Sequence, residues 1–214
     1  AAWTRQLIEE RMSANMRESA SDFLRVVPVN QAVDATLNIA SYVDAAQILR
    51  SKELIVVTDC MCRKTRGMLE EGCGKPLEAC FMFGTMARYY RDHGLGREID
   101  VDEALKIVKA CQDAGLVTQP ASSVNPAGMC NCCGDCCGVL ASLNEHPRPA
   151  DAVFSNFFAR IEQESCAGCE ACVGRCQMGA IKMNGAGRAE IDPARCIGCG
   201  LCVTACSTGS IRLK

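Results

Sequence analysis

The order of apolar and polar residues predicts several short strands along the chain. Residues 53–59 (ELIVVTD) form a compact apolar run, which is typical of a buried strand. Residues 24–30 (LRVVPVN) indicate another short strand that ends at a turn. Apolar and polar residues alternate on both sides of the GAG at 185–187, which predicts a hairpin, and residues 210–214 (SIRLK) predict a matching final strand.

Other segments favour helices. Residues 2–20 carry many helix formers with alternating charges, which predicts a surface helix. Residues 41–51 (SYVDAAQILRS) predict a helix that begins with a capping box formed by Ser41 and Asp44. Residues 78–94 (EACFMFGTMARYYRDHG) predict a further helix that ends at its final glycine.

The clearest amphipathic pattern lies in residues 99–117. Asp100 is the expected N-cap of this helix, Glu103 completes a capping box, and Gly115 ends it. Cys111 falls on the apolar face of the helix. We therefore predict that this thiol is a small core residue rather than a ligand.

Composition and charge resemble those of ordinary soluble proteins. The chain has 214 residues, 49% of them apolar and 22% charged, which suffices for one large domain or two smaller ones. The net charge of −2 shows no basic excess of the kind that favours nucleic acid. The apolar runs are too short to span a bilayer, and the polar N-terminal segment shows no signal-peptide pattern, so we expect a cytoplasmic protein without a transmembrane segment.

Cysteine is the unusual component. The chain has 18 cysteines but only 2 histidines, so mixed Cys/His zinc sites cannot account for most of the thiols. Disulfide scaffolds are usually short secreted chains that lack a core, whereas this chain is long and has normal apolar content. The sequence therefore predicts thiolate ligation of iron–sulfur clusters in a reducing compartment.

Two cysteine motifs near the C-terminus form an internal repeat. Residues 166–176 (CAGCEACVGRC) and 196–206 (CIGCGLCVTAC) share the spacing C-x2-C-x2-C-x3-C. The first three cysteines of each motif fit three irons of one cubane, and the fourth lies too far along the chain and reaches the other cluster. Small residues let backbone N–H groups approach the sulfides, at Ala167, Gly168, Gly198 and Gly200. This pattern predicts two [4Fe–4S] clusters, cluster I on Cys166, Cys169, Cys172 and Cys206, and cluster II on Cys196, Cys199, Cys202 and Cys176.

Residues 161–214 resemble the bacterial two-cluster ferredoxins in ligand pattern and predicted strands. The resemblance implies the fold of that family for this segment. One departure concerns the residue after the fourth cysteine of each motif, which is usually proline in the family and is Gln177 or Ser207 here. Proline is not a ligand, so the departure bears on local rigidity and reduction potential.

A second group of cysteines lies in residues 59–84, with a spacing that matches no common zinc or ferredoxin pattern. Its members are Cys60, Cys62, Cys73 and Cys80. The predicted helix begins at Cys80, where the positive end of the helix dipole would favour the thiolate. Three basic residues either offset the negative charge of a thiolate cluster or form a solvated face, namely Arg63, Lys64 and Arg66.

Residues 130–137 (CNCCGDCC) hold five further cysteines. Cys130, Cys133 and Cys136 repeat the C-x2-C-x2-C spacing and predict a third cluster, whose fourth thiol comes from elsewhere. Cys132 and Cys137 would then serve another centre, act as redox thiols or form vicinal disulfides, since successive side chains of an extended chain point to opposite sides. The two N-terminal groups together suffice for two cubanes with one thiol spare, or for one larger non-cubane cluster.

Residues 24–214 are similar to multi-cluster ferredoxin-like proteins of anaerobic bacteria and archaea, through DCMCRK, GCGKPLEACFMFG and NPAGMCNCCGDCCGVL. The resemblance implies an α+β protein with a helix-rich, cysteine-rich mixed domain over residues 1–160 and a two-cluster ferredoxin domain over residues 161–214. One or two additional iron–sulfur clusters are expected in the first domain. Relatives often carry a further N-terminal helical domain, which is compatible with a chain that does not begin with Met.

The leading functional hypothesis is an electron-transfer protein or a subunit of an anaerobic redox complex. It would relay single electrons to or from a flavin- or metal-containing oxidoreductase and would meet a membrane only through such partners. The alternative is a low-potential reductase subunit with a catalytic cluster or redox thiols in the N-terminal domain and a small-molecule substrate. No GxGxxG, GxxxxGK or HExxH motif supports a substrate site. A scaffold that hands on metal clusters is a third hypothesis.

Overall fold

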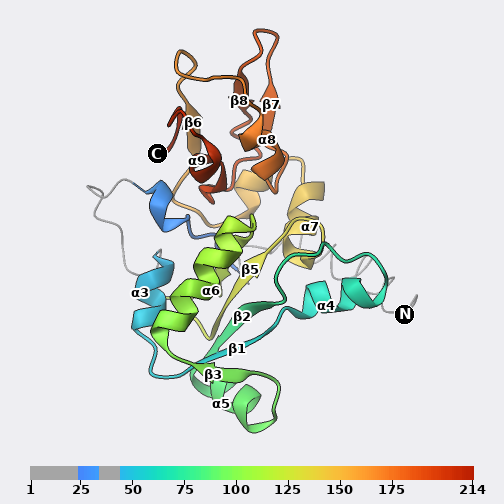
Figure 1. Ribbon diagram of the computed structural model, residues 1–214, viewed down its shortest axis with the longest axis vertical. Helices are drawn as coiled ribbons and strands as arrows, with labels where there is room; N and C mark the ends of the chain where they lie inside the picture. The colour runs from blue at the N-terminus through green and yellow to red at the C-terminus, as the bar shows by residue number, and fades with distance from the viewer. Residues whose placement is uncertain (1–23, 34–43) are drawn as a thin grey trace.

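The computed structural model describes residues 24–33 and 44–214. A five-stranded antiparallel sheet lies in the N-terminal part of the fold (Figure 1). The strand order is β3-β1-β2-β5-β4. The strands are β1 (Ile55–Asp59), β2 (Glu78–Phe83), β3 (Arg97–Ile99), β4 (Val117–Pro120) and β5 (Gly128–Cys132). Because β2 and β5 are neighbours inside the sheet, two cysteine-rich segments that are distant in the sequence meet there.

Helix α6 (Val101–Asp113) packs on this sheet, and contacts four of its strands. Its residues Ala104 and Val108 share an apolar core with Phe81 and Phe83 of β2. The remaining helical elements of this part are η2 (Asn30–Ala32), α3 (Ala45–Arg50), α4 (Met61–Met68), α5 (Gly84–Asp92), α7 (Gly138–Glu145) and η4 (Pro149–Ala152). Across the described ranges, no helix has the length and apolar character needed to cross a membrane.

The C-terminal part consists of two similar halves built around short helices (Figure 1). It contains two two-stranded antiparallel sheets, β6 with β9 and β7 with β8. Helices α8 and α9 contact each other between them. In chain order the elements are β6 (Ala159–Ile161), α8 (Ala171–Arg175), β7 (Ile181–Met183), β8 (Ala189–Ile191), α9 (Leu201–Ala205) and β9 (Ile211–Leu213).

A common apolar core joins the two parts of the molecule. Leu140 and Leu143 of α7 belong to the same buried cluster as Met178, Ile197 and Leu201 of the C-terminal part. Burial of apolar side chains is the main favourable term in folding, so this shared cluster holds the two parts together. The C-terminal part is therefore packed against the rest of the chain rather than attached to it by a bare linker.

Several predicted elements are confirmed. Residues 53–59 contain β1, which is buried along almost its whole length. Residues 99–117 contain α6, and the Asp100 side chain accepts a hydrogen bond of 2.7 Å from the Glu103 N–H at its start. The predicted hairpin around 185–187 is formed by β7 and β8, and the predicted final strand is β9.

Two strand and helix predictions are wrong in part. Residues 24–30 form no regular strand, because Leu24 makes only an isolated bridge to Ala121 and the rest of the segment runs extended beside β4. Pro28 has no N–H to contribute to a longer ladder. The predicted helix over residues 78–94 begins only at Gly84, since residues 78–83 form β2. Pairing with strands on both sides outweighs the helix preference of this segment.

The helix predicted over residues 41–51 also begins later than expected. Its first residue is Ala45, and the N-cap is Asp44, whose side chain accepts hydrogen bonds from the N–H groups of Ala46 and Gln47. Ser41, the predicted cap, and the predicted helix over residues 2–20 lie outside the described residues.

Candidate metal centres

The C-terminal part contains two cavities that are each lined by four cysteines. The larger one, with about 380 Å³ of empty space that includes open solvent, is lined by the set predicted for cluster II, namely Cys176, Cys196, Cys199 and Cys202. The smaller one, with about 320 Å³ by the same measure, is lined by the set predicted for cluster I, namely Cys166, Cys169, Cys172 and Cys206. Each cavity thus combines three cysteines of one motif with the fourth cysteine of the other. The structure brings each predicted set together, and the role of these thiols as ligands stays a prediction.

Glycine is required at two turns of these cysteine loops. Gly168 and Gly198 have φ of 68° and 69°, which lies in the left-handed region that favours glycine. A Cβ on Gly168 would collide with the carbonyl oxygen of Gly187, and one on Gly198 would collide with the carbonyl oxygen of Phe157. The close approach of these loops to neighbouring backbone therefore depends on residues without a side chain.

Backbone N–H groups point at sulfur atoms in the larger cavity. The N–H of Ala180 donates to Sγ of Cys176 at 3.3 Å, and the N–H of Ala159 donates to Sγ of Cys196 at 3.4 Å. Such bonds stabilise negative charge on sulfur. The arrangement suits thiolates better than neutral thiols.

The two cavities differ in exposure. Burial raises the pKa of the Cys199 thiol to about 12, and no cysteine that lines the larger cavity is exposed. In the smaller cavity Cys169 is exposed, and the backbone N–H groups of Ala189 and Gly168 lower the pKa of Cys166. The smaller cavity is therefore the one with an exposed cysteine at its edge.

The N-terminal cysteines gather into two groups, of which the larger has six thiols. Strand register pairs Cys80 of β2 directly with Cys130 of β5. Cys130 and Cys132 are two residues apart on β5 and so lie on the same face of the sheet. Interactions between neighbouring thiols, which perturb the pKa values of several of them, form a series that runs from Cys132 through Cys137, Cys62 and Cys60 back to Cys80. We call this ring the six-thiol group, consisting of Cys60, Cys62, Cys80, Cys130, Cys132 and Cys137.

Neighbouring thiols perturb one another within the six-thiol group. Hydrogen bonds with Cys130 and Cys137 raise the pKa of Cys132 well above its usual value. The same hydrogen bonds hold the pKa of Cys130 and of Cys137 well below theirs. Cys62 is exposed, whereas the other members are buried or half-buried. The ring is therefore a dense set of sulfur donors with one edge open to solvent.

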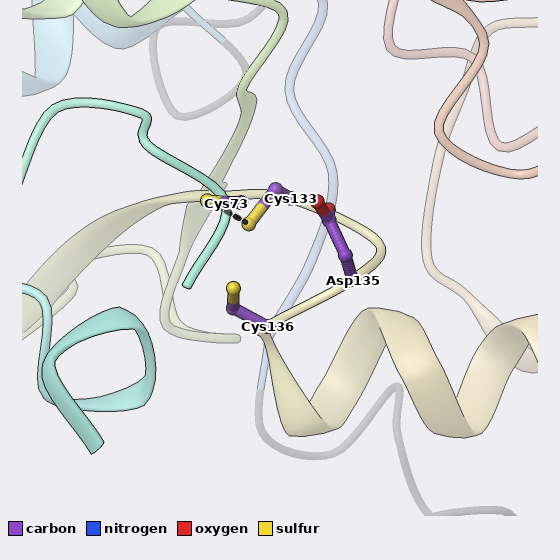
Figure 2. A group of neighbouring side chains, drawn as sticks. All are labelled: Cys73, Cys133, Asp135 and Cys136. Carbon is purple, nitrogen blue, oxygen red and sulfur yellow. Dashed lines mark hydrogen bonds between the residues drawn. The ribbon is translucent and has the colours of Figure 1, made fainter. Parts of the chain in front are cut away.

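The smaller N-terminal group combines three thiols with a carboxylate. The donor atoms of Cys73, Cys133, Asp135 and Cys136 all lie within 4.8 Å of one another, and we call these residues the four-donor group (Figure 2). Cys133 and Cys136 are buried, Cys73 is half-buried, and Asp135 is exposed. The structure does not bring the predicted triplet together, because Cys130 lies in the six-thiol group.

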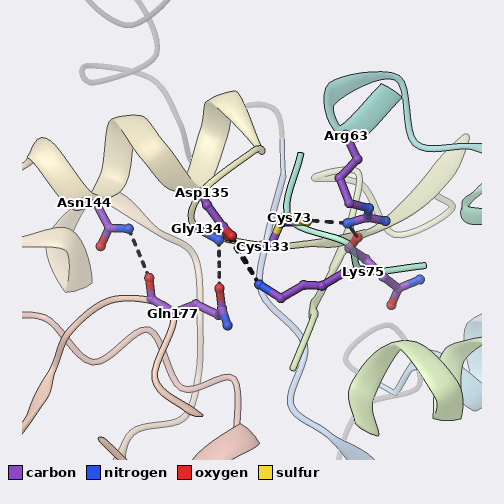
Figure 3. Close-up of polar contacts among 9 residues, drawn as sticks. Arg63, Cys73, Lys75, Cys133, Gly134, Asp135, Asn144 and Gln177 are labelled. Atoms are coloured by element: carbon purple, nitrogen blue, oxygen red, sulfur yellow. Dashed lines mark hydrogen bonds and ion pairs between the residues drawn. The ribbon is translucent and has the colours of Figure 1, made fainter. Parts of the chain in front are cut away.

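The buried side chain of Arg63, on α4, borders both groups. It is 3% exposed, and its Nη1 donates to the Asn131 carbonyl oxygen at 3.0 Å and to Sγ of Cys133 at 3.9 Å (Figure 3). Burial acts to lower the pKa of Arg63, but the sulfurs of Cys60, Cys133 and Cys80 raise it above its usual value. Its Nε and Nη2 atoms have no hydrogen-bond partner among the described residues. A buried guanidinium is costly without a nearby negative group, and the sulfurs of Cys60, Cys133 and Cys80 are the groups that raise its pKa.

The CNCCGDCC loop (residues 130–137) is attached directly to the C-terminal part through Gln177, the residue after Cys176 (Figure 3). The Gly134 N–H donates to Oε1 of Gln177 at 2.8 Å, and Nδ2 of Asn144 donates to the Gln177 carbonyl oxygen at 3.0 Å. A Cβ on Gly134 would lie 2.6 Å from that carbonyl oxygen. The residue that replaces the expected proline thus anchors the CNCCGDCC loop.

Some sequence predictions for these residues are corrected. Cys80 does not begin a helix, so no helix dipole acts on it, and it lies inside β2 instead. Lys64 and Arg66 form ion pairs with Asp59 and Glu71 and have exposed or half-exposed side chains, whereas Arg63 contacts Sγ of Cys133.

Two other residues complete the comparison with the sequence. Cys111 is fully buried, in a cluster with Ala79 and Leu116 that also contains Cys133 and Cys136, which confirms the prediction that it lies in the core. Asp135 was not predicted as a donor. The available signal was its position inside a C-x2-C loop, between Cys133 and Cys136, where any side chain with an oxygen lies close to both sulfurs.

Comparison with known proteins identifies one domain. The family model of the 4Fe-4S dicluster domain matches residues 159–213. No curated protein matches the chain. The C-terminal part is therefore a ferredoxin-like dicluster domain, and this match supports iron–sulfur clusters and electron transfer.

Proposed function

We propose that this chain is an iron–sulfur electron-transfer protein that works as a subunit of a redox complex. The ferredoxin-like domain would hold cluster I on Cys166, Cys169, Cys172 and Cys206 and cluster II on Cys176, Cys196, Cys199 and Cys202. The observation that carries the proposal is the pair of cavities, each lined by one of these sets and matched by the dicluster family model. When bound, such clusters accept and release single electrons.

The residues around the cavities support this role. Apolar side chains such as Ile197 and Leu201 bury the larger cavity, and backbone N–H groups meet its sulfurs. Burial and hydrogen bonds to sulfur are the means by which a protein sets the potential of a cluster. The exposed Cys169 gives the smaller cavity an edge at which a redox partner can approach.

We further propose that the six-thiol group holds at least one additional iron–sulfur cluster. Six sulfur donors exceed the four that a cubane needs, so the ring suits either a cubane with two spare thiols or a larger cluster. The buried cation of Arg63, which borders this ring, supports an anionic centre there. Cys132 and Cys137 share the apolar core of the ferredoxin-like domain, which favours electron exchange between the two parts.

We assign the two kinds of centre to two proposed domains. Residues 1–160 would form the cysteine-rich domain and residues 161–214 the two-cluster domain, packed together over their common core. The expected partners are redox proteins of the cytoplasm, such as a flavin- or metal-containing oxidoreductase complex. The exposed Cys62 at the edge of the six-thiol group favours one second candidate, a low-potential reductase subunit with a reactive thiol at that position.

The first test is the content of iron and acid-labile sulfide in protein purified without oxygen. The two ferredoxin clusters alone correspond to about eight irons per chain, and one or two further clusters raise the content to roughly twelve to sixteen. A content below about eight would contradict the dicluster assignment. A content of about eight would contradict the additional cluster but leave the ferredoxin clusters standing.

Variants separate the parts of the proposal. Replacement of Cys80, Cys130 and Cys132 together by Ala leaves three thiols in the ring, fewer than a cubane needs, and should therefore remove the iron of the N-terminal cluster and leave about eight irons per chain. The matched control is Cys111→Ala, which removes a buried thiol that belongs to neither group. Stepwise reduction followed by electron paramagnetic resonance should show that the remaining clusters still take up single electrons reversibly. Irreversible loss of the signals on one reduction cycle would count against an electron-transfer role.

The same measurements address the second candidate. In this candidate Cys62 is one of the two thiols that a cubane in the ring leaves spare, so Cys62→Ser should abolish substrate reduction by the complex while the iron content and the reversible reduction of the clusters stay unchanged. An electron-transfer subunit should retain its activity in that variant.

A further inference from the structure

The four-donor group is more compact than the thiol sets of the ferredoxin-like domain. Its four donor atoms lie within 4.8 Å of one another, and the Sγ atoms of Cys73 and Cys133 are 3.7 Å apart (Figure 2). The ferredoxin cysteines instead surround two cavities, four to each. In a cubane each thiolate binds a different iron, so the thiolates must spread around the cluster. The compact group therefore fits something smaller.

The spacing matches that of ligands around one tetrahedral metal ion. A metal–sulfur bond of about 2.3 Å in tetrahedral geometry places two thiolates about 3.8 Å apart. The separation of Cys73 and Cys133 agrees with this value. The spacing C-x2-C between Cys133 and Cys136 is also the one that commonly supplies two ligands to a structural zinc ion.

The charges around the group balance when a divalent ion is bound to its deprotonated donors. Three thiolates and one carboxylate carry four negative charges, and a divalent ion offsets two of them. Lys75 lies 3.4 Å from Asp135, and Arg63 lies 3.9 Å from Sγ of Cys133 (Figure 3). These two cations match the remaining charge.

We propose that Cys73, Cys133, Cys136 and Asp135 form a mononuclear tetrahedral site for a thiophilic divalent metal ion, with Zn²⁺ as its occupant. Soft thiolate donors select zinc over magnesium or calcium, and a carboxylate oxygen is an accepted fourth ligand. The site is separate from the iron–sulfur centre proposed for the six-thiol group.

The position of the site indicates what it does. Cys73 lies in the loop after α4, whereas the other three ligands lie in the turn between β5 and α7. A metal ion would cross-link these two segments. Gly134, which lies between the ligands, would then be held against Gln177 of the ferredoxin-like domain. The ion would therefore stabilise the attachment of the two parts.

The test uses the whole chain, purified without oxygen after expression with added zinc. Zinc and iron per chain are measured together, and X-ray absorption at the zinc edge reports the ligands without interference from iron. We expect about one zinc ion per chain with three sulfurs at about 2.3 Å and one oxygen at about 2.0–2.2 Å. Cys136→Ser should lose the zinc and keep all the iron. The control Cys111→Ala, which removes a buried thiol that packs beside the ligands without being one of them, should keep both.

If Cys136→Ser fails to fold, Asp135→Ala is the variant to use. Asp135 is exposed, with 53% of its side-chain surface accessible, so its replacement should not disturb folding. We expect this variant to keep its iron and to bind zinc at least about tenfold more weakly, since even the loss of an outer partner costs about 10–100-fold. The proposal is overturned by the absence of bound zinc, by four sulfur ligands in the native protein, or by loss of iron in Cys136→Ser. The last result would indicate a cluster at this position while leaving the ferredoxin clusters intact.

Discussion

The N–H of Gly134 and the side-chain oxygen of Gln177 are joined by a hydrogen bond of 2.8 Å (Figure 3). Gly134 is at the centre of the CNCCGDCC segment, and Gln177 directly follows Cys176, a predicted ligand of cluster II. A proline at position 177, usual in two-cluster ferredoxins, has no side-chain acceptor for this bond. The departure from the ferredoxin pattern therefore serves the attachment of the cysteine-rich part.

Removal of this acceptor should loosen the loop. In Gln177→Ala the partly buried N–H of Gly134 loses its partner, which costs about 1–3 kcal/mol of local stability. Hydrogen–deuterium exchange of the peptide that covers residues 130–137 should become faster accordingly. The matched control is Ser207→Ala, at the exposed equivalent position after Cys206, which should leave that exchange unchanged. Equal exchange in both variants would show that the bond does not anchor the loop.

A side chain at position 134 should disturb the same contact by collision. The Cβ of Gly134→Ala would lie 2.6 Å from the Gln177 carbonyl oxygen, so one backbone must move. We expect a loss of roughly 1–3 kcal/mol in the free energy of unfolding, as is typical of overpacked sites. Gly138→Ala meets no atom within 4 Å and begins α7, so it should be neutral or slightly stabilising. Anaerobic denaturant titration of both variants compares them, and equal stabilities would contradict the expected collision.

Replacement of the buried cation should affect the N-terminal centre specifically. Arg63→Met keeps much of the side-chain volume but leaves the nearby sulfur charge uncompensated, which costs about 3–5 kcal/mol. If the variant retains its N-terminal iron, the reduction potential of that centre should fall, because a positive charge no longer favours the more negative reduced state.

The control for this change is Lys64→Met on the same helix. Lys64 pairs with Asp59 at the surface, where an ion pair contributes about 0–1 kcal/mol, so the potential should not move. Redox titration followed by electron paramagnetic resonance measures both variants. Equal potentials in Arg63→Met and the native protein would argue against an anionic centre beside this residue.

Removal of metal by an iron chelator should begin at cluster I. Cys169 is exposed, whereas the larger cavity is lined by cysteines that are buried or half-buried. Brief chelation followed by alkylation and mass spectrometry should therefore label Cys169 before Cys199. Labelling of Cys199 first, or of both at one rate, would contradict this order.

Local spacing was sufficient for much of this architecture. The two C-x2-C-x2-C-x3-C motifs define their own loops, because ligands three residues apart can surround one centre whatever the rest of the chain does. The apolar run of β1 and the capped amphipathic pattern of α6 were likewise readable, since burial and capping are local signals.

Tertiary structure decided the grouping of the N-terminal thiols. The spacing of Cys130, Cys133 and Cys136 suggested one centre. However, Cys130 lies within β5, where strand register pairs it with Cys80, whereas Cys133 and Cys136 follow the end of that strand. The sequence alone could not supply that register, because residues 78–83 favoured a helix until two neighbouring strands provided hydrogen bonds and packing.

The contributions of Asp135, Arg63 and Gln177 also depend on the folded chain. Each meets its partners across a long separation in the sequence, as in the contact between Arg63 and Cys133 or that between Gln177 and Gly134. The sequence by itself thus determined which residues carry sulfur and how two motifs fold around clusters. The packing of the sheet decided which sulfurs share a centre, because strand pairing and burial bring together groups that no local pattern connects.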